Sequence, residues 1–413
     1  MMKKKLCLLL VVILCMTSMF ACAKKEDDKK STEKPAEKTE SKTEGKTEDK
    51  TEGKTEGTDE PTTENVKGLY DPIAKEDIKV GVIHITNPAE GSGYTYTHDT
   101  GIVAMQKELG LNDNQIVRKN NVNDQDPAAI QAAIEECIED GANIIFATSW
   151  GYMDVCEQMA EEYPEVIFSH GTGYKGNGKN FNNYFGRIYQ ARYLSGIAAG
   201  LKTESNKIGY VAAQDVNNAE VTGGANAFAM GVHSVNPDAT VYVKVTGSWY
   251  DPEGETAAAE ALINLGCDVL SQHCDTPNPM TVAEENKAFG VGYNSDMSKD
   301  AKDAVLTSVI WHWGSYYTHA VKSVIDGTWD GKNYFGGMAE GLVDLSDLSD
   351  LCAEGTAEKI KEAKDKMVSG EWDVFTGVIE TNDGKTVGEE GKTLDDATIT
   401  GGINWYFKTI ELK

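Results

Sequence analysis

Aromatic and polar side chains recur in the loops that follow the predicted strands of this chain. The residues that these loops offer for binding are Tyr94, Tyr96, Trp150, His170, Trp249, Asp275, Asn294, Asp296 and Trp311. Flat aromatic faces suit a flat ligand that stacks between them. Carboxylates and amides suit amino groups, ring N–H donors or sugar hydroxyls. The pattern predicts a site for a planar small molecule. Core packing is the alternative for each aromatic, and we favour it for Tyr152 and Trp313.

Sequence motifs for catalysis or metal binding do not occur at the same strand ends. Ser, His and Asp are present, but there is no GxSxG elbow and no HExxH. Five cysteines follow the N-terminal region, none in CxxC spacing, and a Cys267–Cys274 disulfide is disfavoured but left open. We expect a binding protein without a metal or cofactor. An extracellular hydrolase is the alternative from another class.

Short apolar runs alternate with helical stretches in the body of the chain. One array runs from a strand at 78–85 to a strand at 166–169, and a second from 207–212 to 288–293. The strands are continuous apolar runs, which is typical of parallel sheets covered on both faces. The first helix is expected at 99–109, after a Gly-rich loop at 93–98.

Two such arrays predict an α/β protein of two doubly wound, Rossmann-like lobes joined by a hinge. Lobe 1 is expected to comprise 78–204 plus about 311–335, and lobe 2 to comprise 205–310 plus about 336–413. The chain is expected to cross between the lobes near 202–206, near 306–310 and after Trp329. Ligands bind outside the carboxyl ends of such strands, so the loop residues are expected to meet in a cleft between the lobes.

The N-terminus predicts export and a lipid anchor. Lys3 to Lys5 precede an apolar run, Leu6 to Ser18, and a lipobox-like segment ends at Cys22. The apolar run is shorter than the ~20 residues of a comfortable membrane span. We expect residues 1–21 to be a lipoprotein signal peptide and Cys22 to be lipidated, on the extracellular face of the cell membrane in a Gram-positive-type cell. A plain signal peptide and a single-span anchor are the alternatives.

Residues 22–68 predict a disordered tether. The segment is rich in Lys, Glu, Thr and Gly, and it contains the repeat KTEGKTEDKTEGKTEG at 42–57. Such a composition buries too little apolar surface to order the chain, and a flexible chain of this length spans roughly 35–40 Å. The formal net charge of the whole chain is −27. The charges of residues 1–21 and of residues 22–68 cancel, so the residues after 68 carry this net charge. An acidic body argues against a nucleic-acid partner.

Several blocks of the sequence resemble the basic membrane protein family over 78–330. They are GYTYTHDTG, IFATSWGYMD, NYFGRIYQARYLSGIAAG, GSWYDPEGETAAAEALINLGCDVLSQHCD and VGYNSDM. The resemblance implies a nucleoside- or purine-binding lipoprotein of an ABC transporter with the type I periplasmic-binding-protein fold. The WYDP and YFGRIYQARYL blocks resemble the branch associated with purine bases. The implied partners are an ABC permease and the membrane, and a monomer is the expected state.

The resemblance also implies roles for single residues. Tyr94 and Trp249 would stack on the base, and Asp275 would accept hydrogen bonds from it. Asn294 and His170 stand where related proteins often carry sugar-binding carboxylates, with Asp296 close by. An amide accepts from vicinal hydroxyls less strongly than a carboxylate does, so a free base is favoured over a nucleoside.

Two alternatives remain within the same fold: a sugar or autoinducer receptor, and a sensor without a permease. Arg187 and Arg192 lie in an apolar helical stretch, where a structural ion pair at the hinge edge is favoured over a phosphate site because neither follows a Gly-rich loop.

Overall fold

The computed structural model describes residues 67–413. The signal peptide expected at 1–21, the lipidation expected at Cys22 and almost all of the expected tether lie outside the described residues. None of the described helices is long and apolar enough to cross a membrane.

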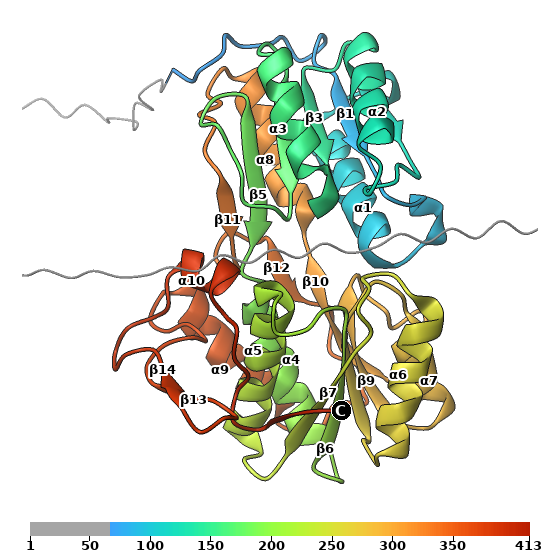
Figure 1. Cartoon of the computed structure of the whole chain (residues 1–413), viewed down its shortest axis with the longest axis vertical. Coiled ribbons are helices and arrows are strands. Elements are labelled where there is room, and N and C mark those ends of the chain that lie inside the picture. Colours follow the sequence, from blue (N-terminus) through green and yellow to red (C-terminus); the bar gives the residue numbers. More distant parts are fainter. Residues whose placement is uncertain (1–66) are drawn as a thin grey trace, which may run out of the picture. The chain divides into compact units, whose positions relative to one another are not determined.

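The first sheet has six parallel strands in the order β11-β5-β4-β3-β1-β2 (Figure 1). Their bounds are β1 Val80–Ile83, β2 Ile116–Lys119, β3 Ile144–Ala147, β4 Ile167–Gly171, β5 Phe181–Gly186 and β11 Tyr334–Gly336. Helices α1 (Gly93–Leu109) and α8 (Trp313–Ile325) pack on one face, and α2 (Pro127–Glu139) and α3 (Met153–Glu162) on the other. Burial on both faces explains why the strands read as continuous apolar runs.

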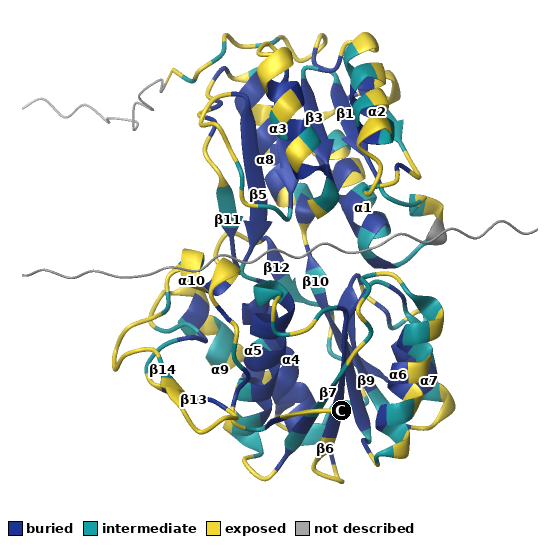
Figure 2. Cartoon of the chain, viewed as in Figure 1, coloured by how far each residue is buried: buried dark blue, intermediate teal, exposed yellow. Residues whose placement is uncertain are grey.

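The second sheet has seven strands in the order β12-β10-β9-β8-β6-β7-β15, with β12 antiparallel to β10. Their bounds are β6 Lys207–Ala212, β7 Thr240–Val245, β8 Val269–His273, β9 Phe289–Asn294, β10 Val305–Trp311, β12 Val343–Leu345 and β15 Ile410–Leu412. Helices α4 (Ile188–Lys202) and α5 (Ala219–Val235) cover one face, and α6 (Pro252–Asn264) and α7 (Asn278–Glu285) the other. Figure 2 shows the buried strands inside both layers of helices.

The first passage of the chain between the sheets lies earlier in the sequence than the expected 202–206, whereas the other two lie at or near the expected places. It crosses at Arg187 between β5 and α4, at His312 between β10 and α8, and at 337–342 between β11 and β12. Helix α4, expected in lobe 1, therefore packs on the second sheet. The physical reason is that small residues let α4 approach α5 closely. A Cβ on Gly196 would overlap the Phe228 carbonyl oxygen of α5. This contact holds α4 against α5 instead of the first sheet.

The first helix begins at Gly93, so the expected loop at 93–98 was wrong. Thr and aromatic residues have modest helix propensity, but contacts with the second lobe stabilise these turns. The Thr97 hydroxyl donates to the Asn294 carbonyl oxygen at 3.1 Å, and the Gly93 amide donates to Ser295 Oγ at 3.3 Å. Tertiary contacts therefore decide the start of α1.

The two arginines of the apolar stretch behave differently. Arg187 pairs with Asp396 of α10 (Asp396–Gly401) at 2.6 Å and lies 3.8 Å from Glu340, so it holds a structural ion pair at the crossover as favoured. Arg192 is fully buried and forms none of the ion pairs found among the described residues. All five described cysteines are free, Cys267 and Cys274 included, and residues 67–413 contain no cluster suited to a metal ion.

After β12 the chain forms α9 (Thr356–Val368), the hairpin β13 (Ile379–Glu380) and β14 (Thr386–Val387), and α10, before β15 pairs with β7. Asn226 of α5 holds this C-terminal segment. Its side chain donates to the Trp405 carbonyl oxygen at 2.8 Å and accepts from the Phe407 amide at 2.7 Å.

Replacing Asn226 by Ala is expected to lower the free energy of unfolding by about 2–4 kcal/mol, because two backbone groups lose their buried partner. Urea denaturation measures the change. The control is Asn217→Ala, at an exposed residue whose side chain bonds only to Asp215 within its own turn. Equal stability of the two variants would contradict the assigned role of Asn226.

Candidate functional site

The first turns of α1 meet the loops after β8 and β9, where the carboxyl ends of strands from both sheets converge. Besides the Thr97 and Gly93 bonds, the Lys299 ammonium bonds to the Gly91 carbonyl oxygen and lies 4.3 Å from the centre of the Tyr96 ring. Tyr96 therefore lies at the contact between the lobes. A Cβ on Gly93 would overlap the Asp275 carbonyl oxygen, so the two lobes touch closely here.

A small pocket opens beside this contact. It is lined by Ile85, Thr86, Ser92, Tyr94, Thr95, Tyr250 and Asp275. Tyr94 packs edge-on against His98, with ring centres 4.5 Å apart. Burial raises the pKa of Tyr94 well above its ordinary value, and the charges of Asp275 and Glu220 add to the shift. The pocket thus joins an aromatic ring of lobe 1 to a carboxyl group of lobe 2.

Two partly buried carboxyl groups lie on the lobe 2 side of the contact. Burial raises the pKa of Asp275 to about 8, although a hydrogen bond from Asn294 Nδ2 at 3.0 Å opposes the shift. Burial also raises the pKa of Glu220 to about 7, against the opposing charge of Arg192. Glu220 lies 3.5 Å from His273 Nε2. Near neutral pH, both groups are close to the point at which they can either donate or accept a hydrogen bond.

Glu255 fixes the two lobe 2 loops relative to each other. Its carboxylate, fully buried, accepts from the Asp251 amide at 3.1 Å and from the Thr276 hydroxyl at 2.6 Å. The Asp275 amide also donates to the Trp249 carbonyl oxygen at 2.9 Å. These bonds set Asp275 beside the loop that carries Trp249 and Tyr250.

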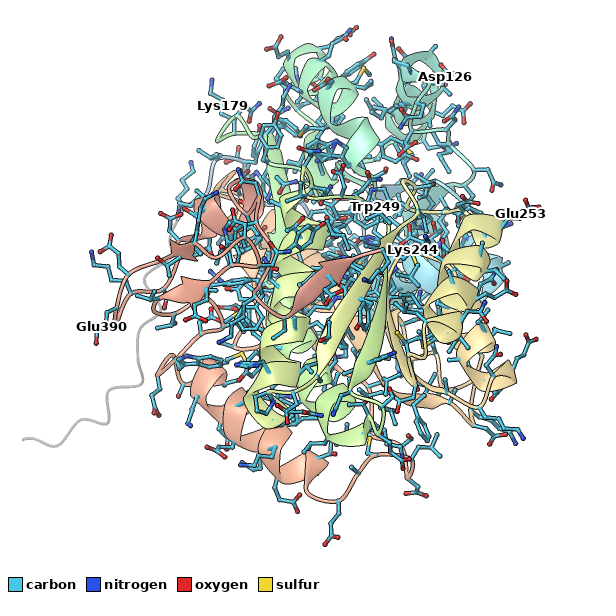
Figure 3. All side chains as sticks on the ribbon, turned by 60° about the horizontal axis from the view of Figure 1, so that its bottom comes forward. Asp126, Lys179, Lys244, Trp249, Glu253 and Glu390 are labelled. Atoms are coloured by element: carbon cyan, nitrogen blue, oxygen red, sulfur yellow. The ribbon has the colours of Figure 1, made fainter. Side chains whose placement is uncertain are left out.

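Trp249 is partly buried, and its ring meets His273 edge-on at 5.8 Å. In Figure 3, Trp249 lies toward the middle of the molecule, whereas Glu253, four residues along the chain, lies at the outside. The structure therefore brings Tyr94, Tyr96, Asp275 and Asn294 to the contact between the lobes, with Trp249 adjoining Asp275.

Trp311 belongs to a column of stacked rings at the second crossover. It stacks on Trp313 at 4.3 Å, and Trp313 stacks on His98 at 4.5 Å. Both tryptophans are buried, and Trp311 Nε1 donates to the Tyr293 hydroxyl at 3.3 Å. The column connects the crossover to the ring of Tyr94 through His98. Tyr152 is buried in the core of lobe 1, and Trp313 is buried too, as favoured for both.

Three predicted residues are not brought to this cluster. Trp150 is 51% exposed beside Tyr174 on the surface of lobe 1. His170 is buried, but its ring nitrogens are held by the Ser149 carbonyl oxygen at 2.7 Å and by Asn183, and burial lowers its pKa to about 4. Asp296 is exposed and accepts from the Ser298 amide.

Two residues near the cleft, Thr172 and Glu220, are absent from the predicted set. Thr172 and the predicted Asn294, at the ends of β4 and β9, both have φ of +68°. Backbone strain of this kind is uncommon in residues other than glycine and clusters at functional sites. Glu220 in the first turn of α5 follows the first strand of lobe 2, as Tyr94 follows that of lobe 1. Glu220 could have been predicted from this equivalent position, whereas the positive φ values could not be predicted from the sequence.

The raised pKa values of Asp275 and Glu220 predict how stability depends on pH. Between their ordinary values and about 7–8 the folded protein holds more protons than the unfolded chain. The free energy of unfolding should therefore fall as pH rises from 6.5 to 8, by up to about 1.4 kcal/mol per pH unit for each group. Below about pH 6.5 the buried histidines, whose pKa values burial lowers, give the opposite dependence. Urea denaturation at pH 6.5, 7.2 and 8 measures the slope.

Asp275→Asn should remove part of that slope, whereas Asp303→Asn, at an exposed aspartate, should leave it unchanged. An equal slope in the wild type and the Asp275 variant would contradict this assignment.

Comparison with known proteins gives two kinds of match. The sequence profile of the family described as ABC transporter substrate-binding protein, PnrA-like, matches residues 78–375. A purine-binding protein of Brucella abortus is 36% identical over 340 residues, covering 82% of this chain and 95% of the relative. A putative ABC transporter glucose-binding protein of Haloferax volcanii is 31% identical over 306 residues, covering 74% of this chain and 76% of the relative.

Solved structures support the fold alone. An ABC transporter solute-binding protein of Aeropyrum pernix superposes with a TM-score of 0.61 at 19% identity, covering 71% of this chain and 92% of that one. The two doubly wound sheets described above are thus the architecture of periplasmic-binding-protein-like solute receptors.

Proposed function

The chain belongs to the PnrA-like family of ABC transporter substrate-binding proteins, and from that premise we propose that it captures a purine base or nucleoside between its lobes and delivers it to an ABC permease. The role is binding and not catalysis. The lobes close on the ligand by a hinge motion at the three crossover segments.

The observation that carries the proposal is the pocket between Tyr94 and Asp275. An aromatic ring of one lobe and a partly buried carboxyl group of the other line it together, with Tyr250 beside them. A purine supplies a face for stacking and N–H groups for the carboxyl. Trp249, from the same loop as Tyr250, would form the second stacking wall. The purine-binding relative from Brucella abortus supports the same ligand class.

A free base fits better than a nucleoside. Vicinal ribose hydroxyls favour a carboxylate acceptor, but Asn294 is an amide and the His170 ring is held by Ser149 and Asn183. Asp296, the nearest additional carboxylate in sequence, is exposed and turned to Ser298. We therefore propose a base held mainly by Tyr94, Trp249 and Asp275.

A sugar is the second candidate, because one relative is named as a putative glucose-binding protein. Sugar sites also combine aromatic faces with carboxyl groups. The two candidates differ in that a sugar has no conjugated ring to stack between Tyr94 and Trp249.

The cellular setting is part of the proposal. Lipidation at Cys22 would anchor the protein on the outer face of the cell membrane, with the segment up to 68 as a tether and the receptor as a monomer. Labelling with a radioactive fatty acid precursor should mark the wild type and not Cys22→Ser.

Titration calorimetry of the protein with purine bases, nucleosides, ribose and glucose tests the ligand class. We expect one site per chain for at least one purine base, weaker binding of its nucleoside, and no heat with ribose or glucose. Binding of glucose without binding of any purine would replace the proposed ligand by the second candidate.

A further inference from the structure

Arg192 of α4 is a buried cation with two unused donors. The residue has no exposed surface, and its Nη1 donates to the Gln272 carbonyl oxygen. Its Nε and Nη2 have no hydrogen-bond partner in the structure. These two N–H groups lie on one edge of the guanidinium, spaced to meet two adjacent acceptors.

Leaving such a charge without partners is costly. A buried guanidinium needs hydrogen bonds or a counter-charge, and no carboxylate lies within ion-pair distance of it among the described residues. The charge of Arg192 lowers the pKa of Glu220, but the Glu220 carboxyl group lies against His273 and forms no ion pair with Arg192. The Nε–H and Nη2–H groups of Arg192 are therefore two donors that a ligand could satisfy.

Arg192 is connected to the proposed stacking wall through a series of rings. Its guanidinium lies 4.1 Å from the centre of the Tyr293 ring. Tyr293 meets His273 edge-on at 4.7 Å, and His273 meets Trp249 at 5.8 Å. The cation thus lies at the carboxyl ends of β8 and β9, on the same side of the lobe as Glu220 and Asp275.

Resting on the proposed function, we propose that the cleft selects 6-oxopurines, with the Nε–H and Nη2–H of Arg192 donating to the O6 and N7 acceptors of the base. Arginine bound to O6 and N7 is the commonest specific contact to guanine. Adenine presents its N6 amino group in place of O6, so that a donor would face a donor.

The carboxyl groups complete the match. A 6-oxopurine carries an N1–H donor, and guanine adds its N2 amino group. Glu220 and Asp275 supply acceptors for these donors on the same lobe. The Asn294 side chain already donates to Asp275, which leaves its Oδ1 as an unpartnered acceptor. Adenine in the same orientation offers no N1–H to these acceptors, and only its N7 accepts from Arg192.

Hypoxanthine and adenine form a matched ligand pair for the test, because they differ at position 6 and in the N1 proton. Calorimetry of the wild type should give about 10-fold or tighter binding of hypoxanthine. Arg192→Gln should reverse the preference, because a glutamine amide pairs with adenine N6 and N7. Arg187→Gln is the matched control, since Arg187 is ion-paired to Asp396, and it should keep the wild-type preference.

Equal affinity of the wild type for the two bases, or an unchanged preference in Arg192→Gln, would overturn the assignment to Arg192. If that variant does not fold, as judged by circular dichroism, Arg192→Lys takes its place and should reduce the preference, because an ammonium lacks the planar fork. Binding of glucose with no purine bound would overturn the proposed function itself, and the inference with it.

Discussion

Gly93→Ala is expected to weaken purine binding by about 5- to 150-fold without unfolding either lobe. A Cβ at this position would overlap the Asp275 carbonyl oxygen across the contact between the lobes. Overpacking of this kind costs about 1–3 kcal/mol, and a cost confined to the closed state reduces affinity directly. Titration calorimetry measures the affinity, and thermal unfolding reports the stability.

Gly91→Ala is the matched control for Gly93→Ala. The two glycines have nearly equal positive φ, 83° and 81°, so an alanine is strained at both. A Cβ on Gly91, however, has no atom within 4 Å. Similar losses of affinity in both variants would show that backbone strain is responsible and that the approach of Asp275 is not part of binding.

Trp249→Ala is expected to weaken purine binding by about 5- to 150-fold, because stacking on an aromatic side chain contributes about 1–3 kcal/mol per base. Trp150→Ala, at an exposed tryptophan outside the cluster, should change the affinity less than about twofold. Quenching of tryptophan fluorescence by the base provides a second readout. If the Trp150 variant shows the larger loss, the ligand lies against lobe 1 at Trp150 and the proposed cleft is wrong.

The architecture was predictable because parallel strands buried on both faces leave continuous apolar runs in the sequence. The runs at 78–85 and 207–212 mark the first strand of each sheet. The position of α4 was not predictable in the same way. It depends on how closely Gly196 approaches α5, and such an approach involves residues that are distant in sequence.

The candidate site was predicted in part, for a related reason. The ends of strands are visible in the sequence, so Tyr94, Asp275 and Asn294 could be placed in the cleft. Trp150 and His170 also follow strands, but one side chain turns to the surface and the other is held by neighbouring groups. Which side chain enters the cleft depends on local hydrogen bonds, such as those of Glu255 to the Asp251 and Thr276 loops.

Arg192 shows most clearly which features of the site could not be predicted from the sequence. Its position in an apolar helix suggested a structural ion pair, and the structure gives it none among the described residues. The buried unpaired edge arises because α4 lies over the carboxyl ends of β8 and β9. A ligand partner for this cation could be recognised only after the crossover at Arg187 had been located.

A crystal structure of the protein with a saturating purine base tests the central claim most directly. We predict electron density for one base between Tyr94 and Trp249, with a hydrogen bond to Asp275 and the lobes in contact through Gly93. An empty cleft with the base bound elsewhere, for example in the lobe 1 groove lined by Tyr316, Trp329 and Tyr334, would contradict the account.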